Sequence, residues 1–230
     1  MKRIYWIVLF LAVLACNIYA VENQLVLLQN CTKPLLTPIL ILFLYIETIG
    51  IRQSLKKYFL LGLLFSWGGD VLLMGQETNP HFFLYGLVSF LIAHLFYSYF
   101  FYSVKKAEHI NFSFLLFFPV LIYYVGLIVF LSPHLGAMKI PVFVYGFVIS
   151  TMFLLALHML YMPALAAGRL LMAGALFFVL SDSALAVNKF YAPFEHAGFV
   201  VMSTYGLAQL FLTLGTLLFI KRERAKHSLF

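Results

Sequence analysis

The sequence predicts an all-α, polytopic integral membrane protein with eight transmembrane helices in one domain, residues 1–230. Apolar residues make up 64% of the chain, charged residues make up only 10%, and the mean hydropathy is +1.01. A soluble domain of this length is far more polar. Eight apolar runs of roughly 17–23 residues follow one another, each long enough for a helix to cross about 30 Å of hydrocarbon. Because the runs are continuous and do not alternate between apolar and polar residues, they exclude a transmembrane β-barrel.

The eight runs are separated by loops that are too short to hold another domain. In chain order, we expect helices at residues 4–20, 34–51, 58–74, 82–102, 112–131, 140–161, 169–187 and 198–220. The first run follows Met1-Lys2-Arg3 and ends near Cys16, as a cleaved signal segment would, but we interpret it as a retained helix. Lys33-Pro34 and Lys139-Ile140-Pro141 mark the beginnings of the second and sixth helices.

The Lys and Arg residues predict that both termini are cytoplasmic, as in a multi-pass protein of a bacterial inner membrane. With the N-terminus inside, twelve of the fifteen basic residues fall on the cytoplasmic side, where such residues are retained. These are Lys2, Arg3, Arg52, Lys56, Lys57, Lys105, Lys106, Arg169, Lys221, Arg222, Arg224 and Lys226. Only Lys33, Lys139 and Lys189 fall outside. The scattered charges explain the net charge of +7 by topology and contact with anionic lipids, and they do not indicate nucleic-acid binding.

Two carboxylates lie inside apolar runs, Asp70 in the third and Asp182 in the seventh. An ionisable group in a membrane-spanning helix costs roughly 2.5–3.5 kcal/mol on insertion scales, so a functional reason is expected for both. Two carboxyls close together in a low dielectric cannot both ionise cheaply, so one of them should hold a proton while the other stays charged. That arrangement supplies one acid and one base, and catalysis is the leading interpretation.

The two carboxylates also occupy matched positions in an internal repeat. Each follows a Gly-x-Leu-Phe stretch, and the Asp lies eight positions after that Gly in both places. The next helices share Tyr85-Gly86-Leu87 and Tyr205-Gly206-Leu207. Because the halves are offset by four helices, they run in the same direction, and the third and seventh helices should face each other. The repeat predicts one polar pocket in the outer half of the bundle, walled by Phe and Leu and suited to an amphipathic ligand. Chance recurrence of Gly, Leu and Phe in membrane helices is the alternative.

Several other polar residues at membrane depth are candidates for substrate binding. They are His94 in the fourth helix, Tyr145 in the sixth, Asn188 at the end of the seventh and Gln209 in the eighth. Hydrogen bonding between neighbouring helices is the structural alternative for each.

Other chemistries are less well supported by the sequence. Ser181 and Ser183 flank an acid, but no Gly-x-Ser-x-Gly nucleophile elbow is present. His81, His134 and His196 fall near the outer face without a recognised zinc-ligand spacing. Phosphate loops and dinucleotide fingerprints are absent, so we expect neither a metal nor a cofactor. A proton-coupled transporter and a nonenzymatic lipid-binding protein are the alternatives from other classes.

The landmarks of the second to eighth helices resemble those of the YhhN membrane family. They are Lys33-Pro34-Leu35, Phe65-Ser66, Gly69-Asp70, Leu73-Met74, Gly86-Leu87, Phe90, Ala93-His94, Tyr97, Pro141, Tyr145, Met152, Gly174, Phe178, Ser181-Asp182, Leu185, Asn188, Tyr205 and Ala208-Gln209. The resemblance implies an eight-helix lysoplasmalogenase, which hydrolyses the vinyl ether of lysoplasmenyl-ethanolamine or lysoplasmenyl-choline to a fatty aldehyde and a glycerophospho-alcohol. It also implies that Asp70 and Asp182 are the catalytic pair.

Two carboxyls suffice for that chemistry without a metal. One acid protonates the β-carbon of the vinyl ether, and the other carboxylate stabilises the resulting oxocarbenium ion and deprotonates the incoming water, as in glycosidases. Which Asp plays which part stays open at this point. Lys33 is the expected anchor for the phosphodiester of the lysophospholipid, with capping of its helix at the headgroup level as the alternative.

Overall fold

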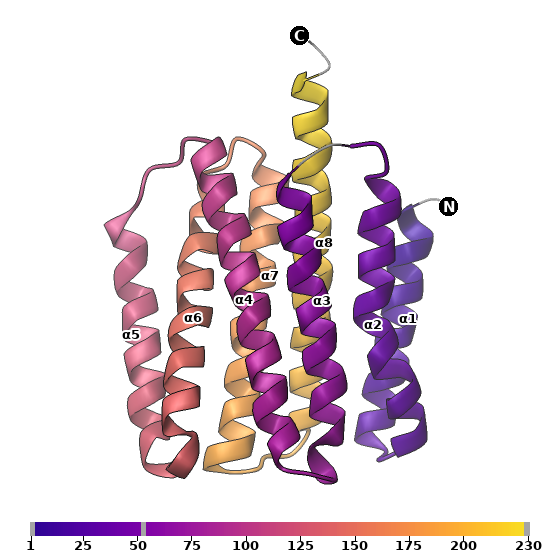
Figure 1. Cartoon of the computed structure of the whole chain (residues 1–230), viewed down its shortest axis with the longest axis vertical. Helices are drawn as coiled ribbons and strands as arrows, with labels where there is room; N and C mark the ends of the chain where they lie inside the picture. Colours follow the sequence, from indigo (N-terminus) through magenta and orange to yellow (C-terminus); the bar gives the residue numbers. More distant parts are fainter. Residues whose placement is uncertain (1–2, 52–53, 228–230) are drawn as a thin grey trace.

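The computed structural model describes residues 3–51 and 54–227, and it is an antiparallel bundle of long helices (Figure 1). In the described residues, eight helices are long and apolar enough to cross a membrane. They are α1 (Arg3–Glu22), α2 (Val26–Glu47), α3 (Leu55–Met74), α4 (His81–Ala107), α5 (Phe114–Leu131), α6 (Lys139–Leu157), α7 (Leu165–Ala186) and α8 (Ala197–His227). The all-α polytopic prediction is therefore confirmed. Lys2 and Arg52, which entered the charge prediction, lie outside the described residues.

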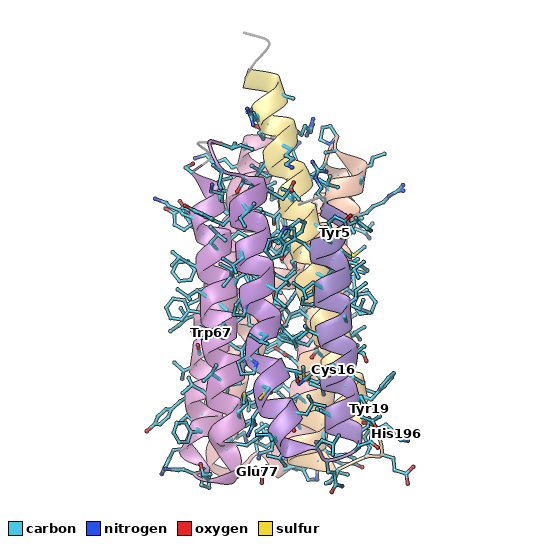
Figure 2. All side chains as sticks on the ribbon, turned by 90° about the vertical axis from the view of Figure 1, so that its right-hand side faces the viewer. Tyr5, Cys16, Tyr19, Trp67, Glu77 and His196 are labelled. Carbon is cyan, nitrogen blue, oxygen red and sulfur yellow. The ribbon has the colours of Figure 1, made fainter. Side chains whose placement is uncertain are left out.

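Short helical turns extend or follow four of the long helices. They are the 3₁₀ turns η1 (Gly75–Glu77), η2 (Ser132–His134), η3 (Gly136–Met138) and η4 (His158–Tyr161), and the π-helical turn η5 (Val187–Tyr191). Glu77 and His196 lie at the end of the bundle opposite the C-terminus (Figure 2). We call this end, which carries the α1–α2, α3–α4, α5–α6 and α7–α8 connections, the loop end (Figure 1).

Helix α2 begins eight residues before the predicted position, so the sequence-based boundary was wrong. Pro34 and Pro38 lie inside the helix, and Lys33 lies about two turns from its start. A proline in a helix interior removes a backbone donor, and Pro38 leaves the Pro34 carbonyl without its usual partner. The indole Nε1 of Trp67 on α3 donates a hydrogen bond to that carbonyl at 2.9 Å. A contact from another helix thus satisfies the carbonyl that proline leaves free, which local sequence rules do not anticipate.

Trp67→Phe should therefore destabilise the fold by about 1–2 kcal/mol, because it keeps a large ring but leaves the Pro34 carbonyl unpaired. Thermal unfolding in detergent measures the effect. Trp6→Phe is the matched control, since the buried Nε1 of Trp6 has no hydrogen-bond partner among the described residues. The control should leave the unfolding temperature unchanged or slightly raised. Equal losses in the two variants would contradict the role of the Trp67 hydrogen bond.

The centre of the bundle is formed by two closely packed helix pairs, α3 with α4 and α7 with α8. Helices α5 and α6 lie at one edge of the bundle, and α1 and α2 lie at the other (Figure 1). Helices α3 and α7, which the repeat predicted to face each other, are not an extensively packed pair in the described residues. Rings of α4 and α8 occupy the space instead. Phe90 and Tyr205 both contact Phe178 of α7 edge-on, and their own centroids are 5.9 Å apart.

Glycine on α3 makes this arrangement possible. A Cβ atom at Gly69 would lie 2.5 Å from the Phe90 ring, closer than real side chains approach. The missing side chain lets α4 bring Phe90 against the backbone of α3, one residue before Asp70. Gly69 therefore helps to place an aromatic ring beside the carboxylate.

Charged contacts join distant helices at both ends of the bundle. At the loop end, Glu22 accepts hydrogen bonds from His196 Nδ1 at 2.5 Å and from the backbone N–H of Phe199 at 3.1 Å, which caps the start of α8. The hydrogen bond to Glu22 and its negative charge raise the pKa of His196. At the other end, Glu47 of α2 contacts Arg3 at 2.9 Å and Lys221 at 2.5 Å. These contacts tie α1 and α2 to α8.

Candidate active site

The carboxylate of Asp182 lies between three helices near the loop end. It belongs to α7, four residues before that helix ends. Its Oδ2 atom accepts a hydrogen bond from the Tyr145 hydroxyl of α6, and His94 Nε2 of α4 lies 3.4 Å from the same oxygen. His94 Nε2 is also 2.9 Å from the Tyr145 hydroxyl. The side chain of Asp182 is 16% exposed, and its Oδ1 makes no hydrogen bond to any residue that the structure describes. The Oδ2 atom is thus fixed by its neighbours, and the Oδ1 atom is available to a ligand.

Asp182 and Tyr145 contribute polar groups to an otherwise apolar pocket. The pocket contains about 450 Å³ of empty space, part of it open to the surroundings, and its walls come from α3, α4, α6, α7 and η5. Its apolar lining residues are Leu73, Phe83, Leu87, Phe90, Val142, Leu185, Ala186 and Phe190. A concave apolar site with a few convergent polar groups is the usual form of a small-molecule site. The pocket therefore suits an amphipathic ligand whose reactive group meets Asp182.

Asp70 has a different environment from Asp182. It is 2% exposed, and it is not among the residues that line the pocket. Its Oδ2 accepts hydrogen bonds from the Tyr205 hydroxyl at 2.6 Å and from Thr37 Oγ1 at 3.2 Å. Gln209 Nε2 donates to the Tyr205 hydroxyl at 3.2 Å, and the Tyr97 hydroxyl donates to Gln209 Oε1 at 3.1 Å. Asp70 thus belongs to a buried network that reaches across α2, α4 and α8.

The sequence predicted one pocket shared by both carboxylates, and the structure differs on this point. The two groups interact electrostatically, but they accept hydrogen bonds from separate sets of residues, and only Asp182 lines the pocket. Phe90 and Phe178 lie with Tyr205 in the packed aromatic cluster between α3 and α7. The separation follows from the same packing that keeps α3 and α7 apart.

The hydrogen bonds nevertheless repeat across the two halves of the chain. Asp70 accepts from a threonine of α2 and a tyrosine of α8. Asp182 accepts from a tyrosine of α6 and contacts a histidine of α4. Each carboxylate therefore receives one partner from the preceding helix of its own half and one from the last helix of the other half. This exchange is the pattern that a parallel repeat produces around a central axis.

Lys33 lies near Asp70, not at the head of its helix as the sequence suggested. It is partly buried on α2, and its ammonium group interacts electrostatically with Asp70. The two groups form no ion pair within 4 Å among the described residues. Lys33 lies away from the helix start because α2 begins at Val26, so that Pro34 lies inside the helix and does not begin it.

Each of the four polar residues predicted to bind substrate makes a hydrogen bond or close polar contact in the structure. His94 and Tyr145 contact Asp182, whereas Gln209 belongs to the Asp70 network. Asn188 lies in η5, where its Oδ1 accepts a hydrogen bond from the backbone N–H of Phe194 at 3.3 Å. Asn188 therefore holds the loop before α8 and does not line the pocket.

Sequence reasoning missed Thr37 and Tyr205 as partners of Asp70. Tyr205 carries a signal that could have identified it, because Tyr205-Gly206-Leu207 is one of the repeat landmarks. Thr37 carries no comparable signal. Its hydroxyl reaches Asp70 because α2 continues as a helix through Pro34, three residues before Thr37.

The groups considered for other chemistries lie apart from one another. Ser181 and Ser183 donate hydrogen bonds to backbone carbonyls of Val201 and Val179 at 3.0 and 2.5 Å. His81 stacks near Tyr85, His134 packs on Tyr191, and His196 contacts Glu22. Within residues 3–51 and 54–227, no group of three or more His, Cys, Asp or Glu side chains is arranged to hold a metal ion.

The site lies within a range of the chain that matches a known family. The sequence model of the YhhN family matches residues 28–216, a range that includes both carboxylates and all of their hydrogen-bond partners. The chain belongs to the YhhN family. The matched range also includes the whole of the pocket-lining helices α3, α4, α6 and α7.

Curated relatives of this YhhN protein are similar over most of their length. The lysoplasmalogenase TMEM86B of Rattus norvegicus is 31% identical over 209 residues, which are 89% of this chain and 82% of the relative. The lysoplasmalogenase TMEM86A of Homo sapiens is 31% identical over 210 residues, covering 83% of this chain and 78% of the relative. The TMEM86B protein of Sus scrofa is 32% identical over 177 residues, covering 77% and 71%. No solved structure matches the chain.

Proposed function

We propose that this YhhN protein is a membrane lysoplasmalogenase. Its substrate would be lysoplasmenyl-ethanolamine or lysoplasmenyl-choline, and its products a fatty aldehyde and glycerophosphoethanolamine or glycerophosphocholine. The observation that carries the proposal is the available oxygen of Asp182 in an apolar pocket. The relatives that carry the name lysoplasmalogenase supply the substrate class.

The reaction begins with proton transfer from Asp182 to carbon. In its protonated form, Asp182 donates the proton to the β-carbon of the vinyl ether, so a C–H bond forms as the O–H bond breaks. The ether oxygen and the α-carbon then share the positive charge of an oxocarbenium ion. Tyr145 and His94 hold the other oxygen of Asp182, which orients the acid toward the substrate.

Water completes the reaction. Asp182, now a carboxylate, accepts a proton from the water that attacks the α-carbon, which forms a hemiacetal and restores the acid. The hemiacetal collapses to the aldehyde as the glycerol oxygen leaves with a proton. One side chain thus acts first as acid and then as base, and the two steps balance the addition of one water.

Asp70 serves this reaction by its charge, not by direct contact. Burial of Asp70 disfavours its charged form, and the nearby Lys33 ammonium and two hydrogen bonds to one oxygen counter that cost and favour the carboxylate, which is an acceptor only. A fixed negative charge beside the pocket stabilises the oxocarbenium ion in a region of low dielectric. Because like charges repel, a charged Asp70 near Asp182 favours the protonated form of Asp182.

The predicted topology places the pocket toward the outer face of the membrane. Both termini lie at the end opposite the loop end (Figure 1). The excess of Lys and Arg at the terminal end supports a cytoplasmic location for it. Asp70 and Asp182 each lie four residues from the loop end of their helices, about 6 Å along the axis. A lysophospholipid would therefore bring its vinyl ether, which lies next to its headgroup, to this depth.

Aldehyde release tests the proposal directly. Detergent-purified protein is incubated with a lysoplasmenyl lipid, and the fatty aldehyde is measured by a coupled dehydrogenase. The saturated alkyl-ether analogue and the acyl lysophospholipid are matched control substrates, and neither should yield aldehyde. Absence of aldehyde from protein that elutes as a folded species would overturn the proposal. A fatty acid released from the acyl lipid instead would identify an esterase.

Lys33→Gln should raise KM severalfold and change kcat by less than about twofold, because an ammonium group near Asp70 would supply ground-state attraction for the substrate phosphodiester. Steady-state kinetics with the lysoplasmenyl lipid separate the two constants. Lys105→Gln, near the opposite end of α4, is the matched control and should leave both constants unchanged. A loss of kcat at constant KM would reject the anchor role and make Lys33 the counter-ion of Asp70.

A further inference from the structure

A second hollow lies on the membrane-facing side of helices α4 and α6. It contains about 500 Å³ of empty space, part of it open to the surroundings, between two rows of side chains. Leu84, Leu87, Val88 and Leu91 form the row on α4, at the i, i+3, i+4 and i+7 positions of one helix face. We call the hollow the α4–α6 groove. Over the seven steps from Leu84 to Leu91 it follows the helix axis for about 10 Å.

The second row of the groove comes from the start of α6. It consists of Ile140, Pro141, Val144 and Tyr145. Val88 and Val144 are 45% and 48% exposed in the bundle, so the groove opens outward to the lipid phase. Ile140 is the second residue of α6, which places one end of the groove at the loop end.

The groove and the pocket share a wall. Leu87 and Tyr145 line both of them. Tyr145 also donates its hydroxyl hydrogen bond to Asp182, so its ring stands between the lipid-facing groove and the carboxylate. These two side chains therefore separate the lipid-facing groove from the pocket that holds Asp182.

We propose that the α4–α6 groove holds the hydrocarbon chain of a single-chain lipid whose reactive bond lies beside Asp182. The proposal rests on the proposed function and adds the binding site for the chain. Tyr145 has the one polar group in the groove, and that hydroxyl is already bonded. The groove thus offers an occupant only apolar contact.

The membrane setting favours a lipid chain over other apolar occupants. A chain that moves from bilayer hydrocarbon into the groove exchanges one apolar environment for another, so it gains little from water exclusion. The groove instead aligns the chain, and alignment is what a reaction at one bond requires. A lipid with one chain fits because its headgroup can stay at the loop end while the chain follows the groove.

Photolabelling of the full-length protein tests the proposal. The probe is a non-hydrolysable alkyl-ether lysophosphoethanolamine with a diazirine midway along its chain, and labelled peptides are mapped by mass spectrometry. We expect label on the segments 84–91 and 140–145, removed by excess unlabelled analogue. Val88→Trp and Val144→Trp fill the groove from its two sides, and each should reduce this label at least fivefold. Val125→Trp on α5 is the matched control, since Val125 is 47% exposed and lines no part of the groove.

Three results would overturn the groove as a chain site. The first is label spread evenly over lipid-facing helices and insensitive to competitor. The second is an equal effect of Val88→Trp and Val125→Trp. The third is absence of groove label together with a smaller assembly on gel filtration of Val88→Trp, which would assign the groove to a second copy of the chain.

The same experiment separates this inference from the proposed enzymatic function. Competed label in the groove without aldehyde release would support the chain site and reject the vinyl-ether hydrolase. Aldehyde release without label in the groove would reject the chain site and leave the hydrolase in place. Both measurements use the same purified protein, so a failure of folding would abolish both signals and could produce neither of these mixed results.

Discussion

Replacing Asp182 by Asn should lower kcat for aldehyde release by about 10²- to 10⁴-fold, the contribution expected of a general acid. Asparagine keeps the size of the side chain and can still accept the hydrogen bond from Tyr145, but it cannot deliver a proton to carbon. KM should change little, because the apolar walls of the pocket remain. Initial rates of aldehyde formation over a range of substrate concentrations measure both constants.

Ser183→Ala is the matched control for Asp182→Asn. Ser183 is the next residue on α7, and its hydroxyl contacts Tyr123 of α5 and the Val179 carbonyl. The control should keep kcat within about threefold, since it leaves the pocket intact. It also tests the serine-nucleophile alternative, and Ser181→Ala completes that test. Full activity of a folded Asp182→Asn protein would remove Asp182 from the mechanism.

Replacing Asp70 by Asn should lower kcat by about 10²- to 10³-fold, which is the usual effect of removing a preorganised charge from a reaction that develops the opposite charge. KM should stay within about threefold of its original value, because Asp70 does not line the pocket. The expected pattern is therefore a loss of turnover without a loss of substrate binding. The same steady-state assay reports it.

Tyr205→Phe provides a milder test at the same position. It removes the 2.6 Å hydrogen bond to Asp70 and keeps the ring that packs against Phe90 and Phe178. A hydrogen bond to a charged group contributes about 1.5–3 kcal/mol, so we expect a fall in kcat of about 10- to 100-fold. If Asp70→Asn does not fold, this variant still decides the point. Unchanged kcat in folded forms of both variants would make Asp70 a structural residue only.

Some features of this protein depend on short stretches of sequence, and these could be predicted. The length and apolarity of a run decide whether a helix can cross a bilayer, so the eight helices were predicted without tertiary information. Asp70 and Asp182 were identifiable for the same reason, since a charge in an apolar run is visible in the sequence itself. The matched spacing of the two halves is also visible, and the hydrogen bonds to both carboxylates follow its pattern.

Other features depend on which helices pack together. A proline usually marks the start of a helix, but Trp67 from α3 satisfies the Pro34 carbonyl and allows α2 to begin at Val26. That shift moved Lys33 from the predicted helix head to the neighbourhood of Asp70. No pattern within α2 could predict it, because the deciding hydrogen bond joins residues 33 positions apart.

The sequence by itself determined that this protein is an eight-helix membrane protein with two intramembrane carboxylates. Those properties follow from hydrophobic length and local composition. The tertiary structure decided that the two carboxylates have different environments, with Asp182 on a pocket and Asp70 in a buried network. The physical reason is the packing of α4 and α8 between α3 and α7, where Gly69 admits Phe90 and Tyr205 reaches across to Asp70.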